Sequence, residues 1–216
     1  MIEVIASVLP FQTYEELKNK IGSLRGVVRV VQIDFCDGIF VPSKTWPFIS
    51  DGFEDFDFQK ITNEEQGLPF WDEFDFEIDL MVADAVENFD IYMGLGAKRM
   101  ILHMEAMENL EDFKNFLEGI DLYIRDNIQI GIAFKPGTPL ENVFPLVPYV
   151  DFVQCMGNDK IGFGGVTLDE KVYKRVEILR EKYPDLPIEI DIGVNEETAP
   201  KLVASGVTKL VTGSVL

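Results

Sequence analysis

Eight short apolar segments, rich in β-branched residues, recur along the 216-residue chain and alternate with segments of helical periodicity. We expect strands in 2–8, the first half of 31–42, 76–82, 99–103, 128–134, 150–156, 188–191 and 209–214. Strands that are separated by helices pair in parallel, and eight of them close into a (β/α)8 TIM barrel. The sequence therefore predicts one α/β barrel domain over residues 1–216.

The intervening segments predict helices at 13–21, 85–94, 107–125, 139–146, 168–183 and 197–205. The strongest amphipathic pattern is 168–183, with Val172, Val176 and Leu179 on one face. The sequence ends directly after the eighth strand, with no segment left for an eighth helix.

One long segment, 43–75, interrupts this alternation. It is acidic and aromatic, and only a weak helix at 63–74 can be drawn in it. Long loops of this kind are often functional. A lid over a binding site and an enlarged surface loop both remain open, and we favour the loop.

The formal net charge of −19 limits the possible partners. A strongly acidic protein is not expected to bind nucleic acid or an anionic membrane surface. A phosphorylated small molecule can still bind through backbone amides. Cys36 and Cys155 lie in apolar strands, no signal peptide is recognisable, and no run approaches the roughly 18 apolar residues of a membrane span. We expect a reducing, cytoplasmic setting.

Polar and sulfur-containing residues mark the carboxyl ends of the predicted strands, where TIM barrels place their active sites. These residues are Ser7, Asp34, Asp79, Met81, His103, Met156, Asp191 and Ser214. Three of them are carboxylates that can face one axis, which predicts either a bound cation or raised pKa values. Salt bridges are the alternative, but few basic residues are near, Lys135 and Lys160 being the nearest.

Glycine-rich turns follow the late strands. They comprise Gly162-Phe163-Gly164-Gly165, Gly193 and Gly213-Ser214. Exposed amides in these loops of a barrel commonly bind phosphate. The turns therefore predict a phosphate site.

The chain resembles the ribulose-phosphate 3-epimerase family over nearly its whole length. The matching motifs are Ala6-Ser-Val-Leu, Asp34-Phe-Cys-Asp-Gly-Ile-Phe-Val-Pro42, Leu80-Met-Val, Gly96-Ala, His103-Met-Glu-Ala106, Pro136-Gly-Thr-Pro-Leu140, Gly162-Phe-Gly-Gly165, Glu189-Ile-Asp-Ile-Gly-Val-Asn195, Glu197-Thr-Ala-Pro-Lys-Leu-Val203 and Gly213-Ser214. The resemblance implies a barrel of the ribulose-phosphate-binding type, a place in the pentose phosphate pathway, and epimerisation of a phosphorylated ketose at C3 through an enediolate. Asp34 and Asp191 would be the catalytic base and acid.

The resemblance also implies a divalent metal, held by the two aspartates and by two histidines. Those histidine positions are Gln32 and Asp79 in this chain, so the implied metal ligands are Gln32, Asp34, Asp79 and Asp191. A set of oxygen donors favours Mg or Mn over Zn. A third carboxylate makes the site more negative, which should weaken electrophilic catalysis unless one Asp stays protonated as the acid.

Other positions follow from the motifs. Ser7, Met81 and Met156 would contact substrate, although Met156 fits only with one extra residue before Gly162. His103 matches a different family position and is interpreted as a core residue.

Several alternatives remain. The chain could be a weak or inactive sugar-phosphate-binding barrel, or an epimerase of a related hexose phosphate. Hexulose-phosphate synthase is disfavoured because that family needs a Lys where this chain has Cys36. We also expect homo-oligomers, because barrels of this family associate and no eighth helix covers the last strand.

Overall fold

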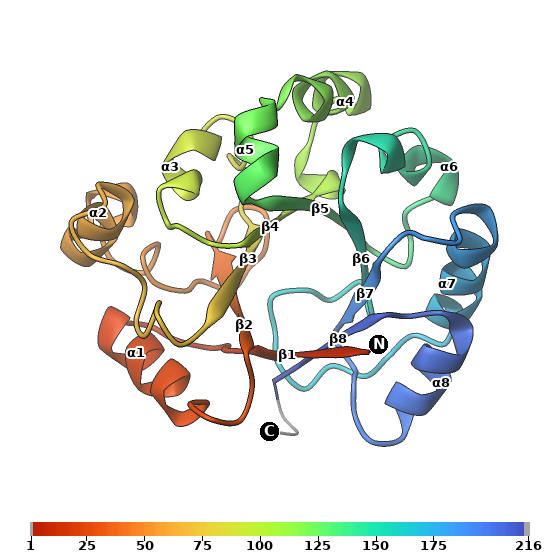
Figure 1. The fold of residues 1–216 in the computed structure, drawn as a ribbon, viewed down its shortest axis with the longest axis horizontal. Helices are drawn as coiled ribbons and strands as arrows, with labels where there is room; N and C mark the ends of the chain where they lie inside the picture. The colour runs from red at the N-terminus through yellow and green to blue at the C-terminus, as the bar shows by residue number, and fades with distance from the viewer. Residues whose placement is uncertain (1, 214–216) are drawn as a thin grey trace.

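A computed structural model describes residues 2–213, which contain a closed barrel of eight parallel strands in sequential order, as the sequence predicts (Figure 1). The strands are β1 Glu3–Ser7, β2 Val30–Cys36, β3 Asp75–Met81, β4 Arg99–His103, β5 Gln129–Phe134, β6 Phe152–Met156, β7 Ile188–Asp191 and β8 Lys209–Thr212. The fold is a TIM barrel. Ser214, expected to bind substrate, lies outside the described residues.

Helices surround the barrel (Figure 1). They are α1 Tyr14–Ser23, α2 Phe56–Thr62, α3 Phe89–Met93, α4 Leu110–Gly119, α5 Leu122–Asn127, α6 Leu140–Val143, α7 Lys171–Lys182 and α8 Thr198–Ser205, with short 3-10 turns η1 Gly52–Glu54, η2 Met104–Ala106 and η3 Val147–Tyr149. Among residues 2–213, no helix follows β8 to cover the outer side of the barrel where β8 pairs with β1. Val4 on β1 is 45% exposed.

Strand β2 is buried along its whole length because both of its faces are covered. Val31, Ile33 and Phe35 belong to the main apolar core. Since side chains alternate along a strand, Gln32 and Asp34 point to the opposite side, into the barrel. The β2–β3 register sets Asp34 beside Asp79. Local strand geometry thus places two buried carboxylates next to each other.

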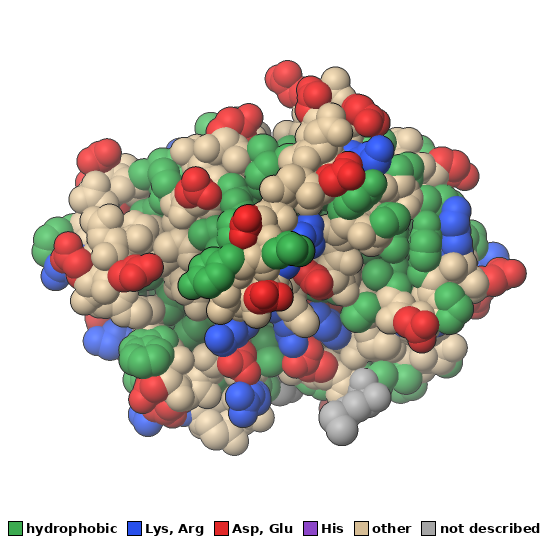
Figure 2. Space-filling model, turned by 45° about the horizontal axis from the view of Figure 1, so that its top comes forward, with side chains coloured by type: hydrophobic (Ala, Val, Ile, Leu, Met, Phe, Trp, Pro, Cys, Tyr) green, Lys and Arg blue, Asp and Glu red, His purple; other side chains and the backbone are tan. Residues whose placement is uncertain are grey.

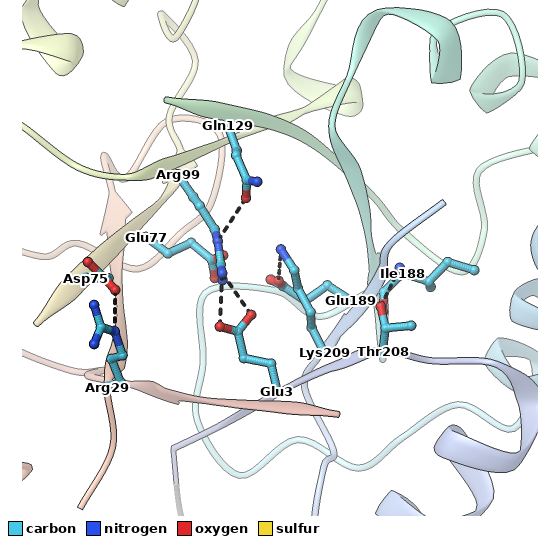
Figure 3. A network of polar contacts seen from close by, with 10 residues as sticks. All are labelled: Glu3, Arg29, Asp75, Glu77, Arg99, Gln129, Ile188, Glu189, Thr208 and Lys209. Carbon is cyan, nitrogen blue, oxygen red and sulfur yellow. Dashed lines mark hydrogen bonds and ion pairs between the residues drawn. The ribbon is translucent and has the colours of Figure 1, made fainter. Parts of the chain in front are cut away.

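An ion-pair network fills the barrel at the amino-terminal ends of the strands (Figure 3). Arg99 Nη2 lies 2.9 Å from Glu3 Oε2, and Arg99 Nη1 lies 3.4 Å from Glu77 Oε2. Lys209 Nζ lies 3.6 Å from Glu189 Oε2. Because these side chains occupy that end of the barrel, the polar site described below is reached from the opposite end.

The segment 43–75 differs from the prediction. Its α-helix is α2, and the helix predicted at 63–74 is wrong because 63–74 forms turns. Asp55 Oδ1 caps α2 by accepting hydrogen bonds from the amides of Asp57 and Phe58, and it also accepts one from Trp46 Nε1. Trp46 is buried against Phe58. The segment therefore packs through aromatic side chains on Phe35 of β2.

The helix predicted at 107–125 is two helices in the structure. α4 ends at Gly119, and Asp121 then caps α5 by accepting a hydrogen bond from the amide of Tyr123 at 2.7 Å. The predicted apolar face of 168–183 is confirmed, since Val172, Val176 and Leu179 of α7 are buried.

Acidic side chains are scattered over the face seen in Figure 2 rather than collected in one patch. This distribution is typical of a solvated surface. Among residues 2–213, no helix combines the length and apolar composition needed to cross a bilayer.

Candidate active site

A cavity of about 580 Å³ lies at the carboxyl ends of the strands. The predicted site residues that line it are Ser7, Asp34, Met81, Gly162, Phe163, Gly164, Gly165, Asp191, Gly193 and Gly213. Gln32, Asp79 and Met156 do not line it but lie buried in the barrel. The structure thus brings both proposed catalytic aspartates to one cavity.

Asp34, at the end of β2, is held on both carboxylate oxygens. Oδ1 accepts a hydrogen bond of 2.7 Å from Gln32 Nε2, and Oδ2 accepts one of 2.7 Å from Ser7 Oγ. Asp34 is only 2% exposed. Two donors therefore fix the orientation of this carboxyl group in the cavity wall.

Asp79 is bound in the same way from two other strands. His103 Nε2 lies 2.8 Å from Asp79 Oδ1, and Gln154 Nε2 donates to Oδ2 at 2.9 Å. All three side chains are fully buried. The interpretation of His103 as a core residue holds for its burial, but its partner is a carboxylate of the predicted site.

Asp191, at the end of β7, receives a different kind of support. Its Oδ1 accepts a hydrogen bond of 2.8 Å from the amide of the next residue, Ile192. Ile192 has φ +77°, a left-handed conformation that is an outlier for a β-branched residue. Such strain is retained where the surroundings over-determine it, as at active sites.

Burial and mutual repulsion favour the protonated forms of the two cavity aspartates. Burial, followed by the charge of Asp79, raises the pKa of Asp34 to about 7, although hydrogen bonds from Gln32 and Ser7 act in the opposite direction. Burial, followed by the charges of Asp34 and Asp79, raises the pKa of Asp191 well above its ordinary range. Near neutral pH this pair can hold a proton, which one acid and one base require.

The turn after β2 depends on Asp37, which precedes Gly38. Asp37 Oδ1 accepts hydrogen bonds from the amides of Ile39 and Phe40, and Oδ2 accepts one of 2.7 Å from the amide of Ala83. Asp37 thus ties the ends of β2 and β3 together and is not free for chemistry.

Glycines shape the other side of the cavity. Gly162 has φ +80°, and a Cβ there would lie 2.4 Å from Ser43 Oγ; Gly193 has φ +76°, and a Cβ there would lie 2.5 Å from the amide nitrogen of Leu168. Lys201 is the one cation among the described lining residues, and it lies 3.6 Å from Glu197. An anion bound here would depend mainly on backbone amides.

The implied divalent metal does not fit these side chains. Among residues 2–213, no group of three or more His, Cys, Asp or Glu side chains is arranged to hold an ion. Every carboxylate oxygen of Asp34 and Asp79 already receives a hydrogen bond or imidazole contact from the protein. The chemistry of the site is therefore derived from its own side chains.

Gln154 and the Asp79 contact of His103 were missed in the sequence. The available signal was the inward position of Gln154, two residues before Met156 in a strand that is otherwise apolar. Gln154 Nε2 also lies 3.2 Å from Met156 Sδ. Met156 therefore supports the buried polar cluster and does not line the cavity.

Comparisons with known proteins agree with this architecture. The model of the ribulose-phosphate 3 epimerase family matches residues 3–216. A ribulose-phosphate 3-epimerase from Eremothecium gossypii is 32% identical over 186 residues, which cover 85% of this chain and 73% of that protein. The Bacillus subtilis ribulose-phosphate 3-epimerase is 27% identical over 223 residues, covering 100% and 92%.

A solved structure of 3-hexulose-6-phosphate synthase superposes with a TM-score of 0.63 at 15% identity, over 99% of this chain and 90% of that one. At this identity the similarity concerns the fold alone. The family match spans the whole barrel and includes the strand ends that carry Asp34 and Asp191. The chain belongs to the ribulose-phosphate 3-epimerase family.

Proposed function

We propose that this protein epimerises a phosphorylated ketose at C3, converting ribulose 5-phosphate to xylulose 5-phosphate. The observation that carries the proposal is the pair Asp34 and Asp191, which line one cavity with raised pKa values and glycine-rich turns beside them. The named activity of the Eremothecium gossypii and Bacillus subtilis relatives supports the same reaction.

In the proposed reaction, the Asp34 carboxylate takes the proton from C3 and an enediolate forms. The Asp191 carboxyl group then gives a proton to the other face of C3, which inverts that centre. Asp34 is buried and Asp191 is partly buried, so the proton transfers are largely shielded from bulk water. The amides of the 162–165 turn and of Gly193 would hold the phosphate, while Ser7 and Met81 would contact the sugar.

A coupled assay of xylulose 5-phosphate formation tests this proposal. Asp34→Asn and Asp191→Asn should each lower kcat by about 10²-fold or more, the usual contribution of a positioned acid or base. Glu189→Gln is the matched control, because Glu189 is a buried carboxyl group at the other end of the barrel. Wild-type activity in both aspartate variants would refute the assignment. A ketohexose 6-phosphate assayed in parallel distinguishes a hexose-phosphate epimerase.

A sugar-phosphate-binding protein without turnover is the second candidate. The observation in its favour is that Asp34 and Asp79 are paired with protein donors where the family resemblance implies metal ligands. Binding of ribulose 5-phosphate by calorimetry, with no conversion under any metal condition, would establish this alternative.

Location and assembly form part of the same proposal. Cys36 and Cys155 are free and buried, which agrees with a reducing cytoplasm. Val4 on β1 is 45% exposed, and association with further copies of the chain would bury it. Sedimentation analysis tests the assembly, and a monomer would contradict it.

A further inference from the structure

A buried polar cluster consists of Gln32, Asp34, Asp79, His103 and Gln154. Each carboxylate oxygen of its two aspartates already has a protein partner, which leaves few free ligands for a cation. Four side-chain groups approach the two carboxylates, one at each oxygen, at 2.7 to 2.9 Å. These groups are the Ser7 hydroxyl, the Gln32 amide, the His103 imidazole and the Gln154 amide. A metal ion that used these carboxylates would have to compete with all four contacts.

The orientation of the two amides strengthens this argument. A glutamine binds a metal through its oxygen, but Gln32 and Gln154 both direct their nitrogens at carboxylates. If the Gln32 amide were turned over, its Oε1 would face Asp34 Oδ1 at hydrogen-bond distance, and two acceptors would repel each other. The carboxylates therefore impose the observed orientation.

The unpartnered atoms of the cluster lie on separate strands, and none of them belongs to a carboxylate. Gln32 Oε1, Gln154 Oε1 and His103 Nδ1 are buried and have no hydrogen-bond partner among residues 2–213. Sites of this kind suit an ordered water molecule. A divalent cation instead prefers charged oxygen ligands, and the carboxylate oxygens of Asp34 and Asp79 are already engaged.

We infer that this enzyme works without a bound divalent metal. The Gln32 and Gln154 amides and the His103 imidazole act as positioning groups that hold Asp34 and Asp79. The inference rests on the proposed epimerase activity where it concerns turnover, but its metal-binding component can be tested without that activity.

Direct binding is the first test. The full chain, dialysed against a chelator, is titrated with Mn²⁺ and free Mn²⁺ is measured by electron paramagnetic resonance. We expect no stoichiometric Mn²⁺ site and unchanged kcat after chelation. One Mn²⁺ per chain that is lost in Asp34→Asn would overturn the inference. Absence of turnover together with absence of Mn²⁺ binding would refute the proposed function while supporting the metal-free cluster.

A gain-of-binding variant provides the positive control. Gln32→His combined with Asp79→His removes one paired carboxylate and supplies two imidazoles beside Asp34 and Asp191. We expect this variant to acquire one Mn²⁺ or Zn²⁺ per chain, detected by resonance or by elemental analysis of the protein. Wild-type protein that binds metal as tightly as the double variant would overturn the inference, and this comparison needs no enzyme activity.

Gln32→Met tests the positioning role. The side chain keeps its length but cannot donate to Asp34, and loss of a hydrogen bond to a charged group corresponds to about a tenfold or greater effect. Because Gln32 does not line the cavity, kcat should fall about tenfold while KM changes less than about twofold. If the loss of activity were matched by a loss of folded protein, so that kcat per folded chain stayed unchanged, the positioning role would be overturned.

Discussion

Replacing Asp34 by Asn should remove a pH-dependent cost that this buried carboxyl group imposes on the fold. Its pKa is raised from 3.8 to about 7 in the folded protein, chiefly by burial. The folded state therefore binds the proton more tightly than the unfolded state, and stability falls as pH rises between these values. Asn has nearly the same shape, can still accept from Gln32, and can donate to the Ser7 hydroxyl.

The magnitude follows from the shift. Each pKa unit corresponds to 1.36 kcal/mol, so the full cost of ionising Asp34 is about 4 kcal/mol. Between pH 5 and pH 7 the free energy of unfolding of the wild type should fall by about 2 kcal/mol in total relative to Asp34→Asn, because the slope is at most about 1.4 kcal/mol per pH unit and halves near the folded pKa. Above the folded pKa the difference should level off.

Urea unfolding followed by circular dichroism at pH 5, 6, 7 and 8 measures this difference. Asp90→Asn, which removes an exposed carboxylate on α3, is the matched control and should run parallel to the wild type. Parallel pH dependences for wild type and Asp34→Asn would refute the reasoning, because they would mean that Asp34 is ionised at little cost.

Three further substitutions test other parts of the structure. Ile192→Gly should be more stable than Ile192→Ala by about 1 kcal/mol in urea unfolding, because Ala keeps the left-handed strain at φ +77° while Gly relieves it; greater stability of the Ala variant would contradict the strain. Glu189→Gln should stabilise the protein more at pH 8 than at pH 5, with a difference of about 1 kcal/mol or more in the free energy of unfolding between the two effects. The reason is that burial, followed by the charge of Glu77, raises the pKa of Glu189 well above its ordinary range. An effect independent of pH would show that Glu189 is ionised at little cost. Gly193→Ala should raise KM for the sugar phosphate about tenfold or more, because its Cβ would lie 2.5 Å from the backbone of Leu168 in the cavity wall. Gly26→Ala is the control and should leave KM unchanged, because Gly26 has nearly the same φ but faces open space.

The barrel could be predicted because its signal is local and repeated. Apolar runs of strand length alternate with helical periodicity, and in a strand whose two faces are both covered a polar side chain needs either a partner inside the barrel or a function. The same logic found Asp34, Asp79 and Asp191, since a carboxylate near the end of an apolar strand has few structural uses.

The details that escaped prediction depend on contacts between distant segments. Helix α2 begins where Asp55 caps it and Trp46 packs against Phe58, and no periodicity marks such a start. Gln154 meets Asp79 across 75 positions of sequence. By contrast, Gly119 and Asp121, which end α4 and cap α5, were visible signals for splitting the helix predicted at 107–125.

Hydrogen exchange at C3 tests the central claim most directly. Ribulose 5-phosphate is incubated with the enzyme in deuterium oxide, and the substrate and product are analysed by NMR. If Asp34 takes the proton from C3 and Asp191 returns one to the other face, deuterium should appear at C3 with the wild type and should be almost absent with Asp34→Asn. Asp191→Asn should still exchange the C3 hydrogen of ribulose 5-phosphate but should form almost no xylulose 5-phosphate. Deuterium incorporation by Asp34→Asn, or formation of xylulose 5-phosphate by Asp191→Asn, at the wild-type rate would contradict the account.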